Sequence, residues 1–362
     1  MDISKIDENF KALPTSMEGG KATYVIPNDG FSLHGVFYDS EEKCFLRMPL
    51  SVAATVSEGV AYLSHHTAGG RLCFATDSKT LEIVVQYKIL EAMPHMAITG
   101  SAGFTLCKKT KDGERFLVNL MPHFGCGDGF TAAAELAGEG VQEYVLYFPL
   151  YNNVTGLSVR LDEGATVRKS KAYRDVLPIL YYGSSITQGG CASRPDNAYQ
   201  GLICKKNEID YINLGFSGNA KAEESMVDYL STIDCSLFVC DYDHNAPRVE
   251  HLENTHYALY ERYRKARPST PILFLTRPDY ARVNVHESEK RMDIIRNTYK
   301  RARKAGDKKV FFLSGMEFYG KENFENFAVD GCHPTDYGFA KMAKRIYEKM
   351  CKIDKIFKGK KK

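Results

Sequence analysis

The hydrophobic pattern of this chain changes once, between Lys169 and Asp175, and no other feature constrains the fold as strongly. From about residue 22 to 167, short apolar or alternating runs are separated by turn sequences, which is typical of a β-sandwich. Beyond the change, apolar runs alternate with amphipathic segments, the pattern of βαβ units around a mostly parallel sheet. Single cores stop growing at roughly 250 to 300 residues. For 362 residues we therefore expect two domains, 1–172 and 173–362.

Six runs in the first region have strand character, and an alanine-rich stretch at 131–137 fits no element. These runs are 71–75, 81–87, 103–107, 116–120, 143–148 and 156–161. The second region has five apolar runs that each resemble a strand buried on both faces. They are 177–182, 211–214, 236–241, 272–276 and 310–313.

The last helix should cover the parallel sheet, because its apolar residues recur with helical period on one face. They are Phe339, Met342, Ala343, Ile346, Tyr347 and Met350. The sequence therefore predicts an α/β domain behind an all-β domain.

Ligand crevices of open α/β sheets lie beyond the carboxyl ends of the strands. The segments that follow the predicted strands are Gly183–Gly189, Gly215–Asn219, Asp243–Asn245 and, after a longer connection, Asp330–Pro334. Each segment alone is compatible with a simple turn or helix cap.

Together the four segments supply every group that acyl transfer requires: a nucleophile, a base, an acid that orients the base, and oxyanion donors. The D-x-x-H spacing of Asp330 and His333 puts a carboxylate within one turn of an imidazole. The carboxylate can then accept from Nδ1 and leave Nε2 to face a serine.

These blocks resemble the SGNH hydrolases, or GDSL-type esterases, in their order and in their placement after strands. The resemblance implies a flavodoxin-like, three-layer hydrolase domain. It also implies that Ser185 is the nucleophile, that Asp330 and His333 complete the triad, and that Ser185, Gly218 and Asn245 form the oxyanion hole.

Two positions depart from the family pattern. Ser184 stands where the family has an aspartate, which leaves two candidate nucleophiles. We favour Ser185, the third residue of the G-x-S pattern, and Ser184 is the alternative. Asp243 stands where the third block has a glycine, two residues before Asn245.

A subgroup of the family has an N-terminal β-sandwich and the sequence G-[ST]-S-I-T-Q-G at the nucleophile. This chain is similar to it in both respects, and family 2 carbohydrate esterases share the domain order. The resemblance implies a jelly-roll-like first domain. It also implies a serine esterase that removes small acyl groups, acetyl above all, from an acylated carbohydrate. The alternatives are a lipid or thioester hydrolase and a carbohydrate-binding protein with a decayed site.

Composition adds further expectations. A net charge of +3 gives no argument for a nucleic-acid or membrane partner, and the oligomeric state is open. The N-terminus lacks the apolar core of a secretory signal. Ten cysteines occur without a CxxC pair, and Cys73, Cys107, Cys235 and Cys240 lie in apolar runs. We therefore expect a reducing, cytoplasmic location.

No metal or cofactor is expected, because the two histidine pairs, 65 with 66 and 251 with 256, offer no good ligand face. His244, which adjoins Asn245, is a candidate for substrate contact. Four tyrosines near the motif loops could stack on a sugar ring, although a tyrosine at a strand end more often packs in the core. They are Tyr182, Tyr199, Tyr242 and Tyr280.

Overall fold

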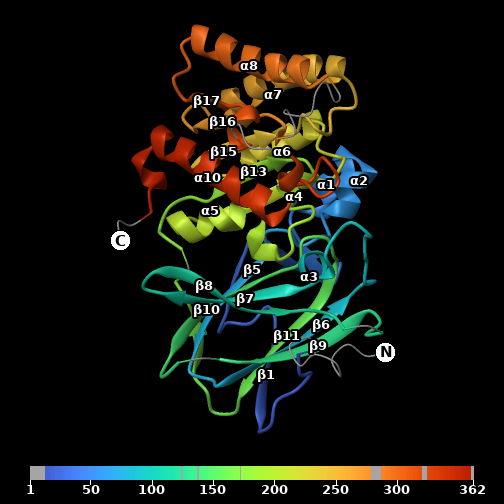
Figure 1. The fold of residues 1–362 in the computed structure, drawn as a ribbon, viewed down its shortest axis with the longest axis vertical. Helices are drawn as coiled ribbons and strands as arrows, with labels where there is room; N and C mark the ends of the chain where they lie inside the picture. Colours follow the sequence, from blue (N-terminus) through green and yellow to red (C-terminus); the bar gives the residue numbers. More distant parts are fainter. Residues whose placement is uncertain are drawn as a thin grey trace.

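The computed structural model describes residues 13–123, 125–136, 138–171, 173–278, 287–319 and 324–359. In Figure 1 an antiparallel, β-rich N-terminal half lies below an α/β C-terminal half. The predicted fold class is confirmed. The domain boundary at 172/173 stays a prediction, and it adjoins Ala172, which lies outside the described residues.

The N-terminal half is a sandwich of two antiparallel sheets. The first sheet has the order β1 (Lys21–Val25), β11 (Val154–Asp162), β6 (Thr80–Tyr87), β9 (Gly129–Glu135). The second has the order β12 (Val167–Lys169), β5 (Arg71–Thr76), β10 (Gln142–Tyr147), β7 (Phe104–Thr110), β8 (Gly113–Leu120), and β2 (Ser32–His34) also pairs with β5. A small hairpin joins β3 (Phe37–Asp39) to β4 (Cys44–Leu46). Residues 131–135 of the unassigned alanine-rich stretch belong to β9, where Ala132, Ala133 and Ala134 are buried, and Ala137 lies outside the described residues.

In the second sheet, strand β5 is buried on both of its faces, and so is β10 for most of its length. Alternate residues of a strand point to opposite sides, and in β5 Leu72 and Phe74 enter the sandwich core. Cys73 between them joins a second core that contains residues of the C-terminal half. The two halves therefore share a continuous apolar interface, which explains why β5 and β10 read as unbroken apolar runs.

The C-terminal half is built on a five-stranded parallel sheet. Its order is β14 (Tyr211–Gly215), β13 (Ile179–Gly183), β15 (Leu237–Asp241), β16 (Ile272–Leu275), β17 (Val310–Leu313). In chain order this is 2-1-3-4-5, the flavodoxin-like arrangement. All five predicted strands are confirmed to within two residues at either end.

Helices cover both faces of the parallel sheet. They are α4 (Ser185–Gln188), α5 (Tyr199–Asn207), α6 (Glu224–Thr232), α7 (Val249–Ala266), α8 (Ser288–Lys304), α9 (Met316–Tyr319) and α10 (Asp336–Ile353). Tyr181 of β13 packs in the core with α5 and α10, whereas Tyr182 packs in the core with α6 and α7. The apolar face predicted for α10 is buried, apart from the half-buried Tyr347.

The expectation that residues 22–167 form only strands and turns is wrong for three helices. They are α1 (Leu50–Val56), α2 (Glu58–Leu63) and α3 (Ile98–Ser101). Ala53, Val60 and Leu63 are buried in the same core as α6 of the other half. These short segments lack a full amphipathic period, so their helical form depends on packing against the α/β half.

Two buried arginines of the N-terminal half cover the open edge of the parallel sheet. Arg47 Nη1 donates to the carbonyls of Asn213 (3.1 Å) and Gly215 (2.6 Å), and Arg71 Nη2 donates to that of Tyr211 (2.8 Å). Carbonyls of alternate residues point the same way, so these three face outward from the edge strand β14. The arginines satisfy backbone acceptors that an edge would otherwise expose.

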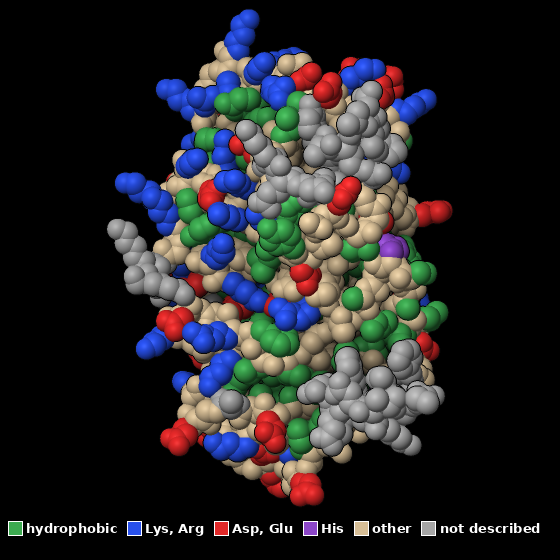
Figure 2. All heavy atoms as spheres, viewed as in Figure 1, with side chains coloured by type: hydrophobic (Ala, Val, Ile, Leu, Met, Phe, Trp, Pro, Cys, Tyr) green, Lys and Arg blue, Asp and Glu red, His purple; other side chains and the backbone are tan. Residues whose placement is uncertain are grey.

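The charged side chains and the cysteines are distributed as in an ordinary globular protein. Lys, Arg, Asp and Glu side chains are spread along the length of the face in Figure 2. The four cysteines expected inside apolar runs are buried and carry free thiols. Among the described residues, no helix combines the length and the apolar character needed to cross a bilayer.

Candidate active site

Three adjacent strands of the parallel sheet end at the same level. Gly183 of β13 pairs in register with Gly215 of β14 and with Asp241 of β15. The segments that follow carry Ser185, Gly218 and Asn245 two, three and four residues further on. The register therefore brings the first three sequence blocks to one rim of the sheet.

Two glycines allow the short helix α4 to lie directly against these strand ends. A Cβ on Gly215 would lie 2.2 Å from the backbone nitrogen of Gln188, and one on Gly183 would lie 2.5 Å from Thr187 Oγ1 of α4 and 2.3 Å from the carbonyl oxygen of Asp241. Thr187 Oγ1 donates to Asp241 Oδ2 at 3.1 Å. Close backbone approach thus fixes the turn on which Ser185 sits.

Ser185, His333 and Asp330 form one hydrogen-bonded series. His333 Nε2 lies 2.8 Å from Ser185 Oγ, and His333 Nδ1 lies 2.7 Å from Asp330 Oδ2. The residues come from α4 and from the loop before α10, 148 positions apart between Ser185 and His333. The fold brings together the predicted serine, imidazole and carboxylate.

The Asp330 carboxylate is held in its charged form. Burial raises the pKa of this group, but hydrogen bonds from the His333 backbone and ring and from the Cys332 backbone outweigh it and lower the pKa to about 2. Asp330 Oδ1 accepts from the backbone N–H of Cys332 (3.0 Å) and of His333 (2.8 Å). The carboxylate is therefore oriented by its own loop.

Ser184 has a different position from Ser185. Its side chain is fully buried and caps α4, because Oγ accepts from the backbone N–H of Ile186 at 3.2 Å. The hydroxyl that meets the imidazole is that of Ser185.

Gly218 and Asn245 lie in the neighbouring loops. Gly218 has φ +68°, in the left-handed region that glycine adopts without strain. Asn245 is buried, and its Nδ2 donates to the carbonyl of Phe216 at 2.7 Å. Within the described part of the chain, the backbone N–H groups of Ser185 and Gly218 donate no hydrogen bond.

Asp243, which stands where the family has a glycine, is fully buried and helps to hold the loop after β15 in place. Its Oδ2 accepts from the backbone N–H of Arg277 at 3.0 Å, and its carbonyl accepts from Arg291 Nη1 at 2.6 Å. The carboxylate thus ties the loop after β15 to the end of β16.

The N-terminal half supports the serine turn through residues that sequence reasoning missed. Tyr151 Oη donates to the carbonyl of Ser185 at 3.2 Å, and Gln188 Nε2 lies 3.2 Å from both His66 Nδ1 and the Leu150 carbonyl. Burial lowers the pKa of His66 to about 3, so the ring is neutral and Nδ1 accepts. No local sequence signal links these distant positions.

The N-terminal half also contacts the segment Gly215–Asn219, which contains Gly218. A Cβ on Gly59 of α2 would lie 2.1 Å from Oδ1 of Asn219, the residue after Gly218. A side chain at position 59 would therefore require the Asn219 side chain to move.

Three of the four tyrosines near the motif loops pack in the core and are not placed to stack on a sugar. Tyr182, Tyr199 and Tyr242 are at most 1% exposed, so core packing, the more frequent role of a tyrosine at a strand end, is confirmed for these three, and Tyr280 lies outside the described residues. They fill the space under the strand ends, where large apolar rings gain most from burial.

The two histidine pairs and His244 lie in different environments. His66 and His256 are buried, whereas His65 and His251 are half-buried and lie against backbone carbonyls. His244 lies at the site, with Nδ1 3.7 Å from Cys332 Sγ.

A serine, an imidazole and a carboxylate in series at the carboxyl rim of a parallel sheet are the arrangement found in serine hydrolases. Residues 177–352 match the GDSL-like Lipase/Acylhydrolase family, and residues 23–167 match the N-terminus of SGNH-hydrolase-type esterases. The chain belongs to the GDSL-type, or SGNH, hydrolases and is an enzyme that acts on ester bonds.

Solved structures share the whole two-part architecture. A Bacteroides ovatus protein assigned as a GDSL-like lipase is 26% identical, with a TM-score of 0.81 over 92% of this chain and 98% of the other. A salicylyl acyltransferase from a tetracycline biosynthetic pathway is 17% identical, with a TM-score of 0.76 over 92% and 97%. A family two carbohydrate esterase from Cellvibrio japonicus is 12% identical, with a TM-score of 0.60 over 94% and 99%. A comparison with curated sequences returned no match.

Proposed function

We propose that this protein is a serine esterase that uses a Ser185–His333–Asp330 triad and an acyl-enzyme. The observation that carries the proposal is the 2.8 Å contact between Ser185 Oγ and His333 Nε2, with Asp330 2.7 Å from Nδ1. Ser185 attacks the ester carbonyl while His333 takes its proton and then returns it to the leaving alcohol. Water, deprotonated by the same His333, next attacks the acyl-enzyme. Asp330, charged throughout, holds the imidazole tautomer and stabilises the imidazolium.

The developing oxyanion is bound by the backbone N–H groups of Ser185 and Gly218 and by the amide of Asn245. This assignment is supported by the two backbone donors, which have no acceptor in the described chain. The Asn245 amide has two N–H bonds, and its bond to the Phe216 carbonyl uses one of them and fixes the group. Such donors need no reorientation during reaction, and each contributes about 3 kcal/mol.

The proposed substrate is an acylated carbohydrate carrying a small acyl group, acetyl above all. Support comes from the shared architecture with a family two carbohydrate esterase and from the order of the two parts along the chain. The alternative is a lipid or thioester substrate with the same triad. A non-catalytic binding protein is not favoured, because the series of contacts from Asp330 to Ser185 is complete.

Transfer of the acyl group to an alcohol instead of water is a second candidate. It is motivated by the similarity to the salicylyl acyltransferase. An acyl-enzyme can be resolved by either acceptor, so adding a sugar alcohol during the assay and measuring acylated product against free acid distinguishes the two outcomes.

The triad is tested by assaying aryl acetate hydrolysis with the variants Ser185→Ala and His333→Ala. We expect each to reduce kcat by about 10⁴-fold or more, since removing one triad member leaves little of its joint effect. Ser184→Ala is the matched control. It removes a helix cap worth about 1 kcal/mol and should keep most of the activity. Equal rates for wild type and Ser185→Ala would rule out the nucleophile assignment.

The acyl preference is tested with aryl esters of increasing chain length. A steep fall in kcat/KM beyond acetyl and propionyl esters supports a small acyl group, and release of acetate from acetylated oligosaccharides supports the carbohydrate. Rates that increase with chain length would instead favour the lipid or thioester alternative.

A further inference from the structure

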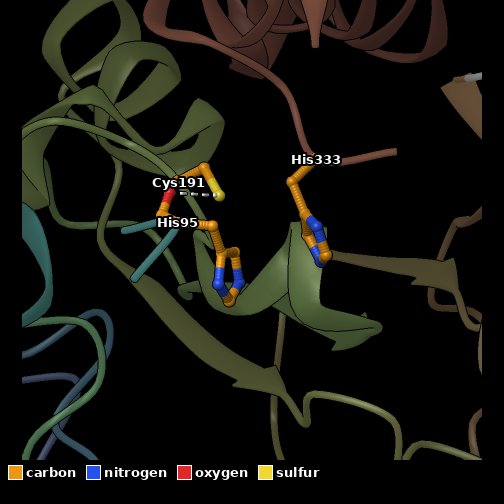
Figure 3. Close-up of side chains that lie close together, drawn as sticks. All are labelled: His95, Cys191 and His333. Carbon is orange, nitrogen blue, oxygen red and sulfur yellow. Dashed lines mark hydrogen bonds between the residues drawn. The ribbon is translucent and has the colours of Figure 1, made fainter. Parts of the chain in front are cut away.

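Three potential metal ligands meet beside the proposed triad. His95, Cys191 and His333 each offer one ligand atom, and these atoms lie within 4.8 Å of one another. Figure 3 shows the three side chains close to one another. His95 belongs to the segment between β6 and α3, Cys191 follows α4, and His333 precedes α10. Because these residues come from three separate segments, no sequence motif predicts the cluster.

We propose that His95, Cys191 and His333 form an inhibitory site for a thiophilic divalent cation, Zn²⁺ in particular. Imidazole nitrogen and thiolate sulfur are the ligands that Zn²⁺ prefers, and three protein ligands leave the fourth tetrahedral position for water. Tetrahedral bonds of this kind put ligand atoms roughly 3.5 Å apart. The cluster therefore has to contract by about 1 Å, and the exposed side chain of His95 is able to move inward.

The orientation of His333 suits a metal ligand. Asp330 Oδ2 lies 2.7 Å from Nδ1, which leaves Nε2 as the ligand atom. A carboxylate that holds the second ring nitrogen is the usual support for a zinc-binding histidine. The same Nε2 contacts Ser185 Oγ at 2.8 Å. Metal at this nitrogen would occupy the lone pair that accepts the serine proton, so the inhibition rests on the proposed function.

Cys191 supplies a sheltered sulfur beside the site. Its side chain is 8% exposed, and Sγ lies 3.4 Å from the backbone carbonyl of His95. Its φ of +71° lies in the left-handed region, which is uncommon for a residue with a side chain. Burial, with the nearby Asp330 carboxylate, raises the pKa of the thiol to about 12. The metal therefore has to displace a proton from sulfur when it binds.

Cys332 provides a matched control because it is a second cysteine at the site, half-buried where Cys191 is buried. Its Sγ lies 3.7 Å from His244 Nδ1, and it is not one of the three clustered ligands. Substituting it by serine changes a thiol next to His333 in sequence and leaves the proposed ligand set intact.

The ligands are identified by Co²⁺ bound to the metal-free full-length protein. A thiolate ligand gives Co²⁺ a charge-transfer band in the near ultraviolet. We expect this band in wild type and in Cys332→Ser, and its loss in Cys191→Ser. A band that persists in Cys191→Ser, or that disappears in Cys332→Ser, would place the metal elsewhere and overturn the proposal, as would the lack of any band in wild type.

The inhibition is measured with ZnCl₂ in the aryl acetate assay, with reversal by EDTA. Loss of one ligand in Cys191→Ser or His95→Gln should raise the Zn²⁺ concentration for half-inhibition at least ~10-fold. Even substitution of a residue that only holds a ligand in place typically lowers metal affinity by that factor. Their activity without metal should stay close to that of wild type, and Cys332→Ser should retain the wild-type sensitivity. Unchanged sensitivity in both ligand variants would refute the site. If wild type lacks esterase activity, the proposed function fails while the Co²⁺ spectra still decide the metal site.

Discussion

The two sides of the candidate triad are held in place in different ways. Ser185 sits on a turn that is packed against β14, β15 and the N-terminal half, which contributes Tyr151, His66 and Leu150. Asp330 and His333 lie in a short loop closed by its own contacts. The backbone N–H of Val329 donates to the His333 carbonyl at 2.8 Å, and Asp330 is bonded within three residues.

The difference has a physical consequence. The acid and the base are placed relative to each other by local hydrogen bonds, so their pairing survives in any fold that keeps the loop. The serine is placed by contacts between residues that are far apart in the chain, so remote substitutions are able to move it. Changes on the acid side should affect chemistry directly, whereas changes behind the serine should affect position and stability.

Among the substitutions that test this comparison, the largest effect is expected for Asp330→Asn, which keeps the shape of the loop but removes the charge. The imidazole loses the partner that fixes its tautomer, so kcat should fall by about 10³- to 10⁴-fold. Steady-state kinetics on an aryl acetate measure the change. Asp293→Asn, which alters an exposed ion pair on α8, is the control and should leave kcat unchanged. A loss below 10-fold would show that the carboxylate does not orient the base.

The lowered pKa of Asp330 predicts that the difference in stability between wild type and Asp330→Asn depends on pH. The pKa of Asp330 is about 2 in the fold, below the usual value of about 3.9 for an unfolded chain. The carboxylate thus stabilises the fold above pH 4, and this contribution is lost as the pH falls towards 2. The difference in melting temperature between wild type and Asp330→Asn should therefore shrink between pH 5 and pH 2. A constant difference over this range would contradict the assignment.

An intermediate effect is expected for Gly190→Ala, which tests the space between the two sides. The added Cβ would lie 3.1 Å from His333 Cδ2 and from Tyr151 Oη, and 3.2 Å from the Ser185 carbonyl. The imidazole has to shift away from the serine, and kcat should fall by about 10- to 100-fold. Gly156→Ala in the sandwich meets a side-chain atom only at 3.4 Å and serves as the control. Full activity in Gly190→Ala would mean that the spacing tolerates the shift.

The smallest effect on catalysis is expected for Tyr151→Phe, which removes the hydroxyl that donates to the Ser185 carbonyl. Stability should fall by about 1 kcal/mol, as for an ordinary buried hydrogen bond, and kcat should change by only a few-fold. Tyr87→Phe also removes a buried hydroxyl bonded to a carbonyl, that of Ala102, but away from the site. Chemical denaturation and kinetics of both variants separate the two effects. A larger loss of kcat in Tyr87→Phe than in Tyr151→Phe would contradict the comparison.

Much of the α/β half follows from the sequence, because each central strand is a continuous apolar run and α10 has a clear helical period. The acid–base pair is equally local, because the hydrogen bonds that join Asp330 to His333 lie within four residues. The sequence leaves Ser184 as an alternative to Ser185, since two adjacent hydroxyls differ only in which way the turn directs them. The structure directs Ser184 into the helix cap and Ser185 toward His333.

Other features depend on contacts that no local pattern contains. Helices α1 and α2 are too short to be stable alone and form against the other half of the chain. The coverage of β14 by Arg47 and Arg71, and the support of Ser185 by Tyr151, join positions more than 30 residues apart. The sequence by itself determined the two kinds of architecture and the residue types of the site, because hydrophobic period and short spacing are local properties. Only the tertiary structure decided how the halves meet and which side chains converge, because these depend on long-range packing.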